Sequence, residues 1–158
     1  MPWTSWLERS AFGTLIRDSV WLYPGIEIVH ILSFAVLIGA AVLFDLRLIG
    51  LSPGISVQAL AGHLLPWARL GLAVAAPTGV LLFIADATAL AGNPALRIKL
   101  LLIVLAILNS VIFHRWTARS MSNWDVGRPT PFRAKLAGIV SLVLWASVVA
   151  GGRLIAYV

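Results

Sequence analysis

One apolar run near the N-terminus constrains the fold of this chain more than any other feature. Residues 23–47 (YPGIEIVHILSFAVLIGAAVLFDLR) exceed the ~20 apolar residues that a helix needs to cross a bilayer. The run nevertheless contains Glu27 and His30, one helical turn apart, and it stops at Asp45 and Arg47. A titratable group inside a membrane span is costly to bury, so it is by default a candidate functional residue. The sequence therefore predicts a membrane-spanning helix that carries a site.

The composition extends this prediction to all 158 residues. Hydrophobic residues make up 60% of the chain and charged residues only 11%, with a mean hydropathy of +0.96. A soluble domain of this size does not need so much apolar surface, so the excess indicates lipid as the solvent. We predict one all-α membrane domain, residues 1–158, built as an up-and-down bundle of four helices. The predicted spans are 20–44, 63–85, 96–113 and 136–155.

The N-terminal segment, residues 3–18, has a different pattern. Apolar side chains that include Trp3, Trp6 and Phe12 are interleaved with charged ones. This predicts an amphipathic helix that lies in the headgroup region, with its tryptophans as anchors. The segment lacks the basic, apolar and small-residue regions of a signal peptide, so we expect it to be retained.

The charge distribution follows the membrane topology. The net charge is +6, and the basic residues lie mainly at the ends of the spans, so we expect no nucleic-acid partner. The loops after the first and third spans hold six Lys and Arg residues against five on the opposite side. This predicts a multi-pass protein of the bacterial inner (plasma) membrane with both termini in the periplasm. The absence of cysteine excludes disulfides, thiolate metal sites and covalent c-type haem attachment.

The three histidines each lie in or at the end of a predicted span. At a rise of 1.5 Å per residue, His114 lies roughly 12 Å, and His63 roughly 15–19 Å, from the centre of its span, toward the same membrane face. His30 lies within about 5 Å of the centre of its span. Two histidines on different helices at similar depth can bind haem iron from both faces. We therefore predict His63 and His114 as axial ligands of one haem b, with His30 as an alternative ligand and a second haem left open.

Neighbouring residues would complete this haem site. Gly71 and Trp67 would give the porphyrin flat and aromatic surroundings, and the side chains of Arg69, Arg115 and Arg119 could pair with its propionates. The alternative is that both histidines are interfacial and hydrogen-bond to headgroups or loop carbonyls.

Glu27 and His30 form an E-x-x-H pair on one helix face. Di-iron carboxylate bundles use this spacing, but they need a second such motif and further glutamates that this chain lacks. The pair could instead relay protons or bind a quinol hydroxyl, since histidine titrates near neutral pH and burial raises the pKa of a glutamate. The structural alternative is a cluster in which Glu27 pairs with Arg153 or hydrogen-bonds to Asn109.

The first span also carries one polar stripe that should face protein rather than lipid. Helical periodicity places on this stripe Glu27, His30, Phe34, Ala41 and Asp45. We interpret Asp45 and Arg47, which follow the predicted end of the span, as an interfacial stop.

Seven segments, YPGIEIVH, FDLRLIG, HLLPW, FIADA, NP, FHRW and GRLIAY, together resemble an uncharacterised family of four-span bacterial inner-membrane proteins. The resemblance covers nearly the whole chain and implies the four-span fold, but it brings no assigned activity. More distantly, the layout is similar to small b-type haem membrane cytochromes and to the membrane domain of CopD-type copper-resistance proteins. The cytochromes commonly use four histidines for two haems, where this chain has three. Copper handling would need softer ligands than its two methionines supply.

These observations lead us to expect a b-type haem membrane protein that transfers electrons and exchanges them with quinol near Glu27 and His30. If it is an enzyme, it should be a quinol-linked oxidoreductase. Its expected partners are the lipid bilayer, quinol, and a redox protein or a second copy of the chain. One alternative is a non-haem ion or metal transporter that uses Glu27, His30 and Asp86. Another is an accessory subunit of a larger membrane complex, in which the polar residues only lock the bundle.

Overall fold

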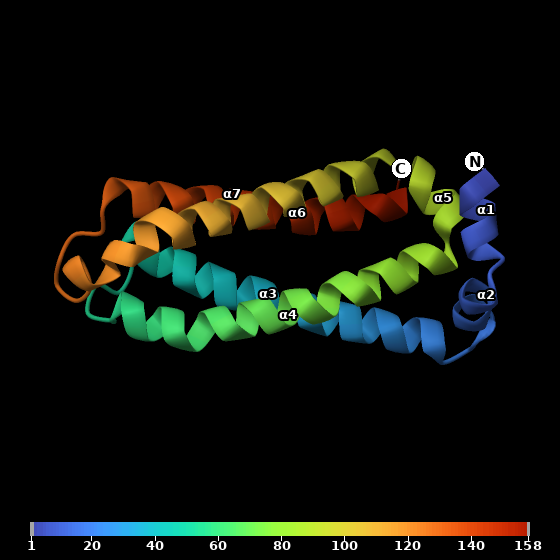
Figure 1. The fold of residues 1–158 in the computed structure, drawn as a ribbon, viewed down its shortest axis with the longest axis horizontal. Helices are drawn as coiled ribbons and strands as arrows, with labels where there is room; N and C mark the ends of the chain where they lie inside the picture. The colour runs from blue at the N-terminus through green and yellow to red at the C-terminus, as the bar shows by residue number, and fades with distance from the viewer. Residues whose placement is uncertain (1, 158) are drawn as a thin grey trace.

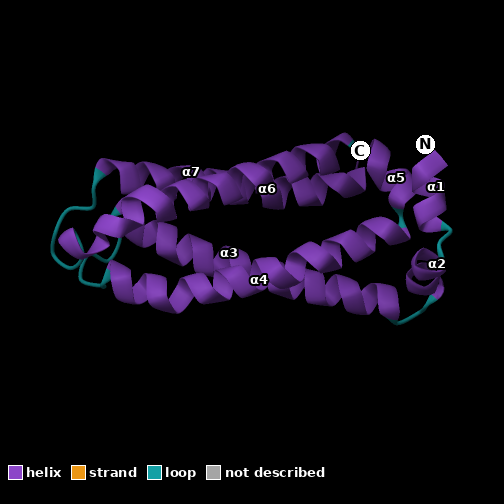
Figure 2. Cartoon of the chain, viewed as in Figure 1, coloured by secondary structure: helices purple, strands orange, loops and turns teal. Residues whose placement is uncertain are grey.

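The computed structural model describes residues 2–157, and within this range the chain is helical and contains no strand (Figure 2). The predicted all-α fold is therefore confirmed. The α-helices are α1 (Pro2–Glu8), α2 (Ala11–Asp18), α3 (Leu22–Ile49), α4 (Val57–Ala85), α5 (Ala87–Gly92), α6 (Pro94–Ile112) and α7 (Phe132–Leu154).

The four long helices run up and down, and both chain ends lie at the same end of the bundle (Figure 1). α3 packs along α4, α6 packs along α7, and α3 and α7 join the two pairs. In the described part of the chain, four helical segments are long and apolar enough to cross a membrane: Leu22–Ile49, Val57–Ala85, Pro94–Asn123 and Phe132–Tyr157. Their outer faces expose large apolar side chains such as Leu101 and Val143. Lipid accounts for this exposure, and we treat the protein as a multi-pass membrane protein.

α3 is longer than its predicted span of 20–44. It continues to Ile49, where Gly50 adopts a φ of 113° and donates its backbone N–H to the carbonyl of Arg47. This left-handed conformation is a common helix end that glycine adopts without strain. The interpretation of Asp45 and Arg47 as an interfacial stop after the helix is therefore wrong. Both lie in its last turns, with exposures of only 5% and 3%.

α4 also begins before its predicted span of 63–85. The side-chain oxygen of Ser56 accepts a hydrogen bond from the backbone N–H of Ala59, so the helix starts at Val57. Serine is among the preferred residues at this capping position because its oxygen satisfies one of the free N–H groups of the first turn. As a result, His63 lies in the second turn of α4 rather than at its start.

The third span continues past its predicted range of 96–113. α6 begins at Pro94, capped by Asn93, whose side-chain oxygen accepts the N–H of Leu96. Beyond α6, the helix first widens into a π-helical turn, Phe113–Thr117, and then tightens into a 3₁₀ segment, Ala118–Asn123. His114 therefore lies inside a helical segment, in a π-turn of the kind often found at functional sites.

Two smaller differences concern the connection after α4 and the start of α7. The connection after α4, expected to be a loop, contains α5. α7 starts at Phe132, one turn before the predicted span of 136–155, directly after Pro131, whose ψ of 148° is extended rather than helical.

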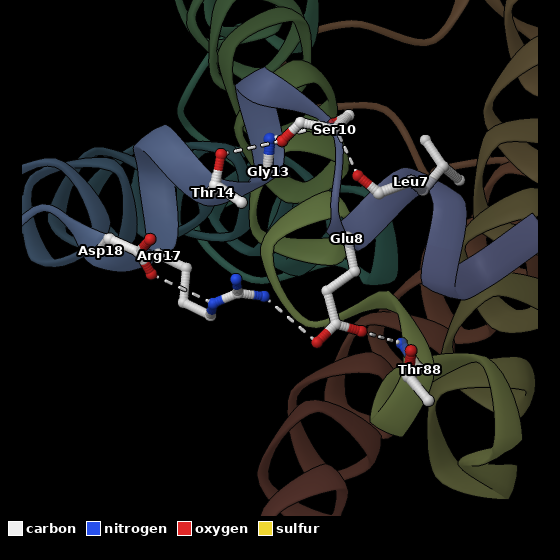
Figure 3. A network of polar contacts seen from close by, with 8 residues as sticks. All are labelled: Leu7, Glu8, Ser10, Gly13, Thr14, Arg17, Asp18 and Thr88. Atoms are coloured by element: carbon white, nitrogen blue, oxygen red, sulfur yellow. Dashed lines mark hydrogen bonds and ion pairs between the residues drawn. The ribbon is translucent and has the colours of Figure 1, made fainter.

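The N-terminal segment forms two helices instead of the single helix predicted for 3–18. Ser10 separates them and caps α2, since its hydroxyl oxygen accepts the N–H of Gly13 (Figure 3). Glu8, at the end of α1, accepts hydrogen bonds from Arg17 at 3.2 Å and from the backbone N–H of Thr88 at 3.1 Å. The contacts from Thr88, more than the nearby Arg17, lower the pKa of the Glu8 carboxyl. This carboxylate therefore fastens α1 to both α2 and α5 at one end of the bundle.

Glycines allow α3 and α4 to pack closely. A Cβ atom on Gly71 would lie 2.6 Å from the carbonyl oxygen of Ser33 and 2.8 Å from the backbone nitrogen of Leu37. Further along, a Cβ on Gly79 would lie 3.0 Å from the ring of His30. The predicted role of Gly71 beside a porphyrin has no support here, because the backbone of α3 occupies the space in front of it. Small residues that recur along one helix, as Gly71 and Gly79 do, are typical of close helix crossings in membranes.

We expect Gly71→Ala to destabilise the protein by about 1–3 kcal/mol, the usual cost of overpacking, because the added methyl group meets rigid backbone atoms of α3. Gly62→Ala is the matched control, since it lies on the same helix and has no atom within 4 Å of its added Cβ. Thermal unfolding of both variants in detergent measures the difference. Equal melting temperatures would contradict the close crossing at Gly71.

Candidate functional site

A cavity of about 150 Å³ lies between α3, α4, α6 and α7. It is in the half of the bundle next to the α3–α4 and α6–α7 connections. Its walls are mostly apolar, with contributions from Leu37, Phe44 and Trp145. The polar residues that line it are Asp45, Arg69, Asn109, Ser110, His114 and Ser141. A protein cavity of about this size can accommodate a molecule as large as benzene. The bundle thus contains a small chamber whose polar groups come from all four long helical segments.

Two buried polar atoms of residues that line this cavity have no hydrogen-bond partner. They are Oδ2 of Asp45 and Nε2 of His114, the only such side-chain atoms found in the part of the chain that the structure describes. Most buried polar groups in proteins are hydrogen-bonded, and an exception calls for an explanation such as a ligand, an ion or water. Both atoms belong to residues that line the same cavity, which makes it the strongest candidate for a site.

The hydrogen bond on the other side of the His114 ring defines the chemistry of its free nitrogen. Nδ1 lies 2.7 Å from the backbone carbonyl oxygen of Ser110. A carbonyl oxygen can only accept, so Nδ1 carries the proton, and in the neutral ring Nε2 presents a lone pair. His114 is therefore oriented to accept a proton or to bind a metal through Nε2.

Asp45 approaches the cavity from α3. Gly138 of α7 lies against this turn, since a Cβ there would be 3.1 Å from the backbone oxygen of Asp45. The hydroxyl of Ser141, one turn along α7, interacts with the Asp45 carboxyl group, while Oδ2 stays without a partner. The cavity therefore presents two acceptors, a carboxylate oxygen and an imidazole lone pair, that lack donors. Such a pair can bind a proton, a cation or a molecule with N–H or O–H groups.

The predicted haem ligand His63 does not reach this cavity. It is exposed, and so is Trp67, one turn later. At 100° per residue, His63 lies about 140–180° around the helix axis from Ala68 and Leu72, which line the cavity. His63 therefore lies on the far side of α4, and the structure does not bring it together with His114.

The arginines predicted to pair with haem propionates are divided. Arg69 lines the cavity, whereas Arg115 and Arg119 are exposed in the segment after α6. Of the predicted haem-site residues, only Arg69 and His114 line this cavity.

The predicted pair Glu27 and His30 lies in the other half of the bundle. Glu27 is exposed and His30 is half-buried. Nδ1 of His30 lies 3.0 Å from the hydroxyl of Thr78, which donates its own proton to the carbonyl of Val74. The Thr78 oxygen therefore accepts from Nδ1, and Nε2 of His30 also presents a lone pair. The fifteen residues of helix between His30 and Asp45 span roughly 22 Å, so the two sites are separate.

The structural alternative for Glu27 is not seen. Asn109 donates to the backbone carbonyl of Ala137, and Arg153 donates to the hydroxyl of Tyr157. The predicted partners of Glu27 therefore make other hydrogen bonds.

Asp45 is the site residue that the sequence interpretation missed. The signal was present, because Asp45 shares the polar stripe of Glu27 and His30. The sequence interpretation assigned Asp45 to an interfacial stop because the predicted span ends at residue 44. Ser141 carries no comparable signal, since a serine in an apolar helix is common and only its neighbour across the helix crossing gives it a role.

A cluster of hydrogen bonds closes the bundle at the cavity end. The buried guanidinium of Arg47 donates to the backbone carbonyls of Pro53, Ile55 and Asp125 at 2.7–3.3 Å. Arg47 thereby ties the connection after α3 to the connection before α7. The neighbouring Trp124 is buried against the same end of the core.

The carboxylate of Asp125 completes this closure at the start of α4. It accepts hydrogen bonds from the Ser56 hydroxyl and from the backbone N–H groups of Val57 and Gln58. The bond from Ser56, followed by those backbone bonds and the charge of Arg47, lowers the pKa of Asp125 below its ordinary 3.8. A carboxylate at a helix N-terminus is also favoured by the helix dipole.

This pKa shift predicts how stability depends on pH. A lowered folded-state pKa means that Asp125 contributes stability above the ordinary aspartate pKa and loses it as the pH falls through the lowered value. We expect Asp125→Ala to lower the melting temperature at pH 7, and the difference from the unmodified protein to shrink progressively as the pH of the detergent buffer falls below 3.8. Asp18→Ala, at an exposed carboxylate of α2, is the control. A loss that is the same at every pH would contradict the assignment.

Comparison with known proteins places the chain in one family. The family described as "Family of unknown function (DUF6644)" matches residues 3–158. No curated protein and no solved structure matches the chain. The resemblance to an uncharacterised family agrees with this match. The distant similarity to b-type haem cytochromes and CopD-type domains stays a prediction.

Proposed function

The chain belongs to this DUF6644 family of unknown function, and we propose that it is a proton-coupled membrane carrier whose coupling site is Asp45 with His114. One observation carries the proposal: the two buried polar atoms without partners belong to two residues that line one cavity. Asp and His inside membrane spans commonly serve as proton relays in pumps and transporters.

The chemistry of the two groups favours a proton as the bound ion. Both unpaired atoms are acceptors, so a proton bound to either turns that atom into a donor that can hydrogen-bond to the other acceptor or to cargo. An imidazole and a carboxylate are both bases, and each binds a single proton without needing further ligands. A divalent metal would need more ligands, and the described residues contain no group of three His, Cys, Asp or Glu side chains suited to one.

The cavity also limits the cargo. A volume of about 150 Å³ suits a molecule of about one aromatic ring. The apolar walls and the two acceptors favour a small neutral or cationic molecule with N–H or O–H donors. We propose that it crosses the bacterial inner membrane and that both chain ends are periplasmic. The cavity would then lie in the cytoplasmic half of the bundle.

Proton flux into proteoliposomes, followed with a trapped pH-sensitive dye, tests the coupling site. We expect Asp45→Asn to reduce the flux by about a hundredfold, at the lower end of what a positioned proton-transfer group contributes. Asp18→Asn makes the same chemical change at an exposed position of α2 and should retain the flux.

Two further variants distinguish this site from the one first predicted from sequence. Glu27→Gln and Asp86→Asn should retain more of the flux than Asp45→Asn. Full flux in Asp45→Asn, with loss in Glu27→Gln, would move the coupling site to the opposite half of the bundle. Absence of flux in every variant and in the unmodified protein would contradict a carrier function.

Quinol-linked electron transfer through haem b is the second candidate. The observation that favours it is that His114 and His30 both use Nδ1 as a hydrogen-bond donor, so that Nε2 carries a lone pair in the neutral ring, as in axial ligands. The fit to a porphyrin is poor, because His63 is exposed on the far side of α4. The cavity is also smaller than the ~300–1,000 Å³ of drug-sized ligand pockets.

The reduced-minus-oxidised spectrum of protein expressed with ample haem tests this candidate. If haem binds, His114→Ala should abolish the low-spin signal of its site, while His63→Ala should leave the signal unchanged. Loss of the signal in His63→Ala would show that His63 reaches the iron in the haem-bound state. A spectrum without b-type bands would exclude the candidate.

A further inference from the structure

Lys99 is a charged residue inside a membrane span that the proposed function does not use. It lies five residues after the start of α6, in a segment of mean hydropathy 2.3. Its side chain is half-buried, and among the described residues its ammonium group has no hydrogen bond and no ion pair. A cation within a span is costly unless it finds a partner.

Two glycines of α7 hold this side chain inside the bundle. A Cβ on Gly152 would lie 3.3 Å from Nζ of Lys99, and one on Gly151 would lie 3.6 Å from its Cβ. The alkyl chain therefore lies on the bare backbone of α7. Nζ is 5.7 Å from the ring centre of Phe34 on α3, a cation–π contact that only partly compensates the charge.

His30 adds a second polar group beside the same ring. Its imidazole stacks on Phe34 with the ring centres 6.2 Å apart and the planes 6° apart. Nε2 of His30 carries a lone pair in the neutral ring and becomes a donor when the ring is protonated. Trp145 packs against the edge of the same phenyl ring, so the surroundings are otherwise apolar.

Glu27 is the nearest acidic residue by depth, but it does not neutralise Lys99. Each lies five residues from the start of its helix, about 7.5 Å along the axis, and both helices start at the same end of the bundle (Figure 1). Glu27 is exposed and forms no ion pair with Lys99 in the structure. The ammonium group therefore keeps an unused capacity for an anion.

We infer that Lys99 binds the anionic group, a carboxylate or a phosphate, of an amphipathic molecule. An ammonium ion forms strong charge-assisted hydrogen bonds with either group. A depth of about 7.5 Å from the helix ends matches the boundary between headgroups and acyl chains, and the neighbouring aromatic rings suit an apolar tail. This site is independent of the Asp45–His114 cavity, because it lies in the other half of the bundle.

Native mass spectrometry of the detergent-solubilised protein tests this site with defined probes. The probes are phosphatidylglycerol, phosphatidylcholine with the same acyl chains, oleate, and inorganic phosphate. We expect phosphatidylglycerol and oleate to bind more tightly than phosphatidylcholine. Lys99→Gln should weaken that binding by about tenfold or more, which corresponds to the loss of one charged contact, and Lys99→Arg should retain it.

Arg97→Gln is the matched control. It removes a positive charge from the same helix, two residues away, at an exposed side chain that donates to the backbone carbonyl of Ala91. Its effect on binding should stay below about twofold, well under the tenfold expected for a charged contact. Competition by inorganic phosphate would identify a free anion as sufficient, whereas binding of the lipids alone would identify a headgroup or fatty acid. Equal binding of both phospholipids, unchanged in Lys99→Gln, would overturn the inference.

Discussion

The structure depends on one constraint, which is that lipid offers no hydrogen bonds to the helices it surrounds. Every polar group within the bundle must therefore find its partner in the protein or in something bound to it. Most do: Asn109 bonds to α7, Thr78 to its own helix and His30, and Arg47 to three carbonyls of the connections. Asp45 and His114 do not, each with one buried atom left unpaired. The proposed function follows from this exception.

The rest of the fold positions these two residues. Gly71 lets α3 lie against α4, and Gly138 lets α7 lie against the turn of α3 that carries Asp45. The π-helical turn after α6 directs His114 toward the same cavity, and the carbonyl of Ser110 orients its ring. Arg47 and Asp125 then join the connections at that end. Close helix crossings supply most of the geometry, and a few hydrogen bonds to backbone atoms determine the orientation of the reactive groups.

The sequence predicted the fold well and the site only in part. Apolar length alone predicted four spans and the up-and-down order, because lipid permits few other arrangements. Depth along the helix axis correctly placed His63 and His114 near the same end. It gave no information about rotation around the axis, and His63 faces the opposite side of α4. The role of Asp45 was not recognised because the predicted span ended at residue 44, whereas α3 continues to Ile49. The sequence did not reveal that Gly50 and Ser56 are the caps that extend α3 and α4, because the contacts of Arg47 and Asp125 next to them are known only from the structure.

The proposed carrier function requires Asp45 and His114 to form one proton-binding site within the membrane. Infrared difference spectroscopy between acidic and alkaline pH observes the protonated carboxyl group directly. We expect a carbonyl band in the unmodified protein that is absent in Asp45→Asn and displaced in His114→Asn, since His114 lines the same cavity. A difference spectrum that is identical in Asp45→Asn and in the unmodified protein would contradict it.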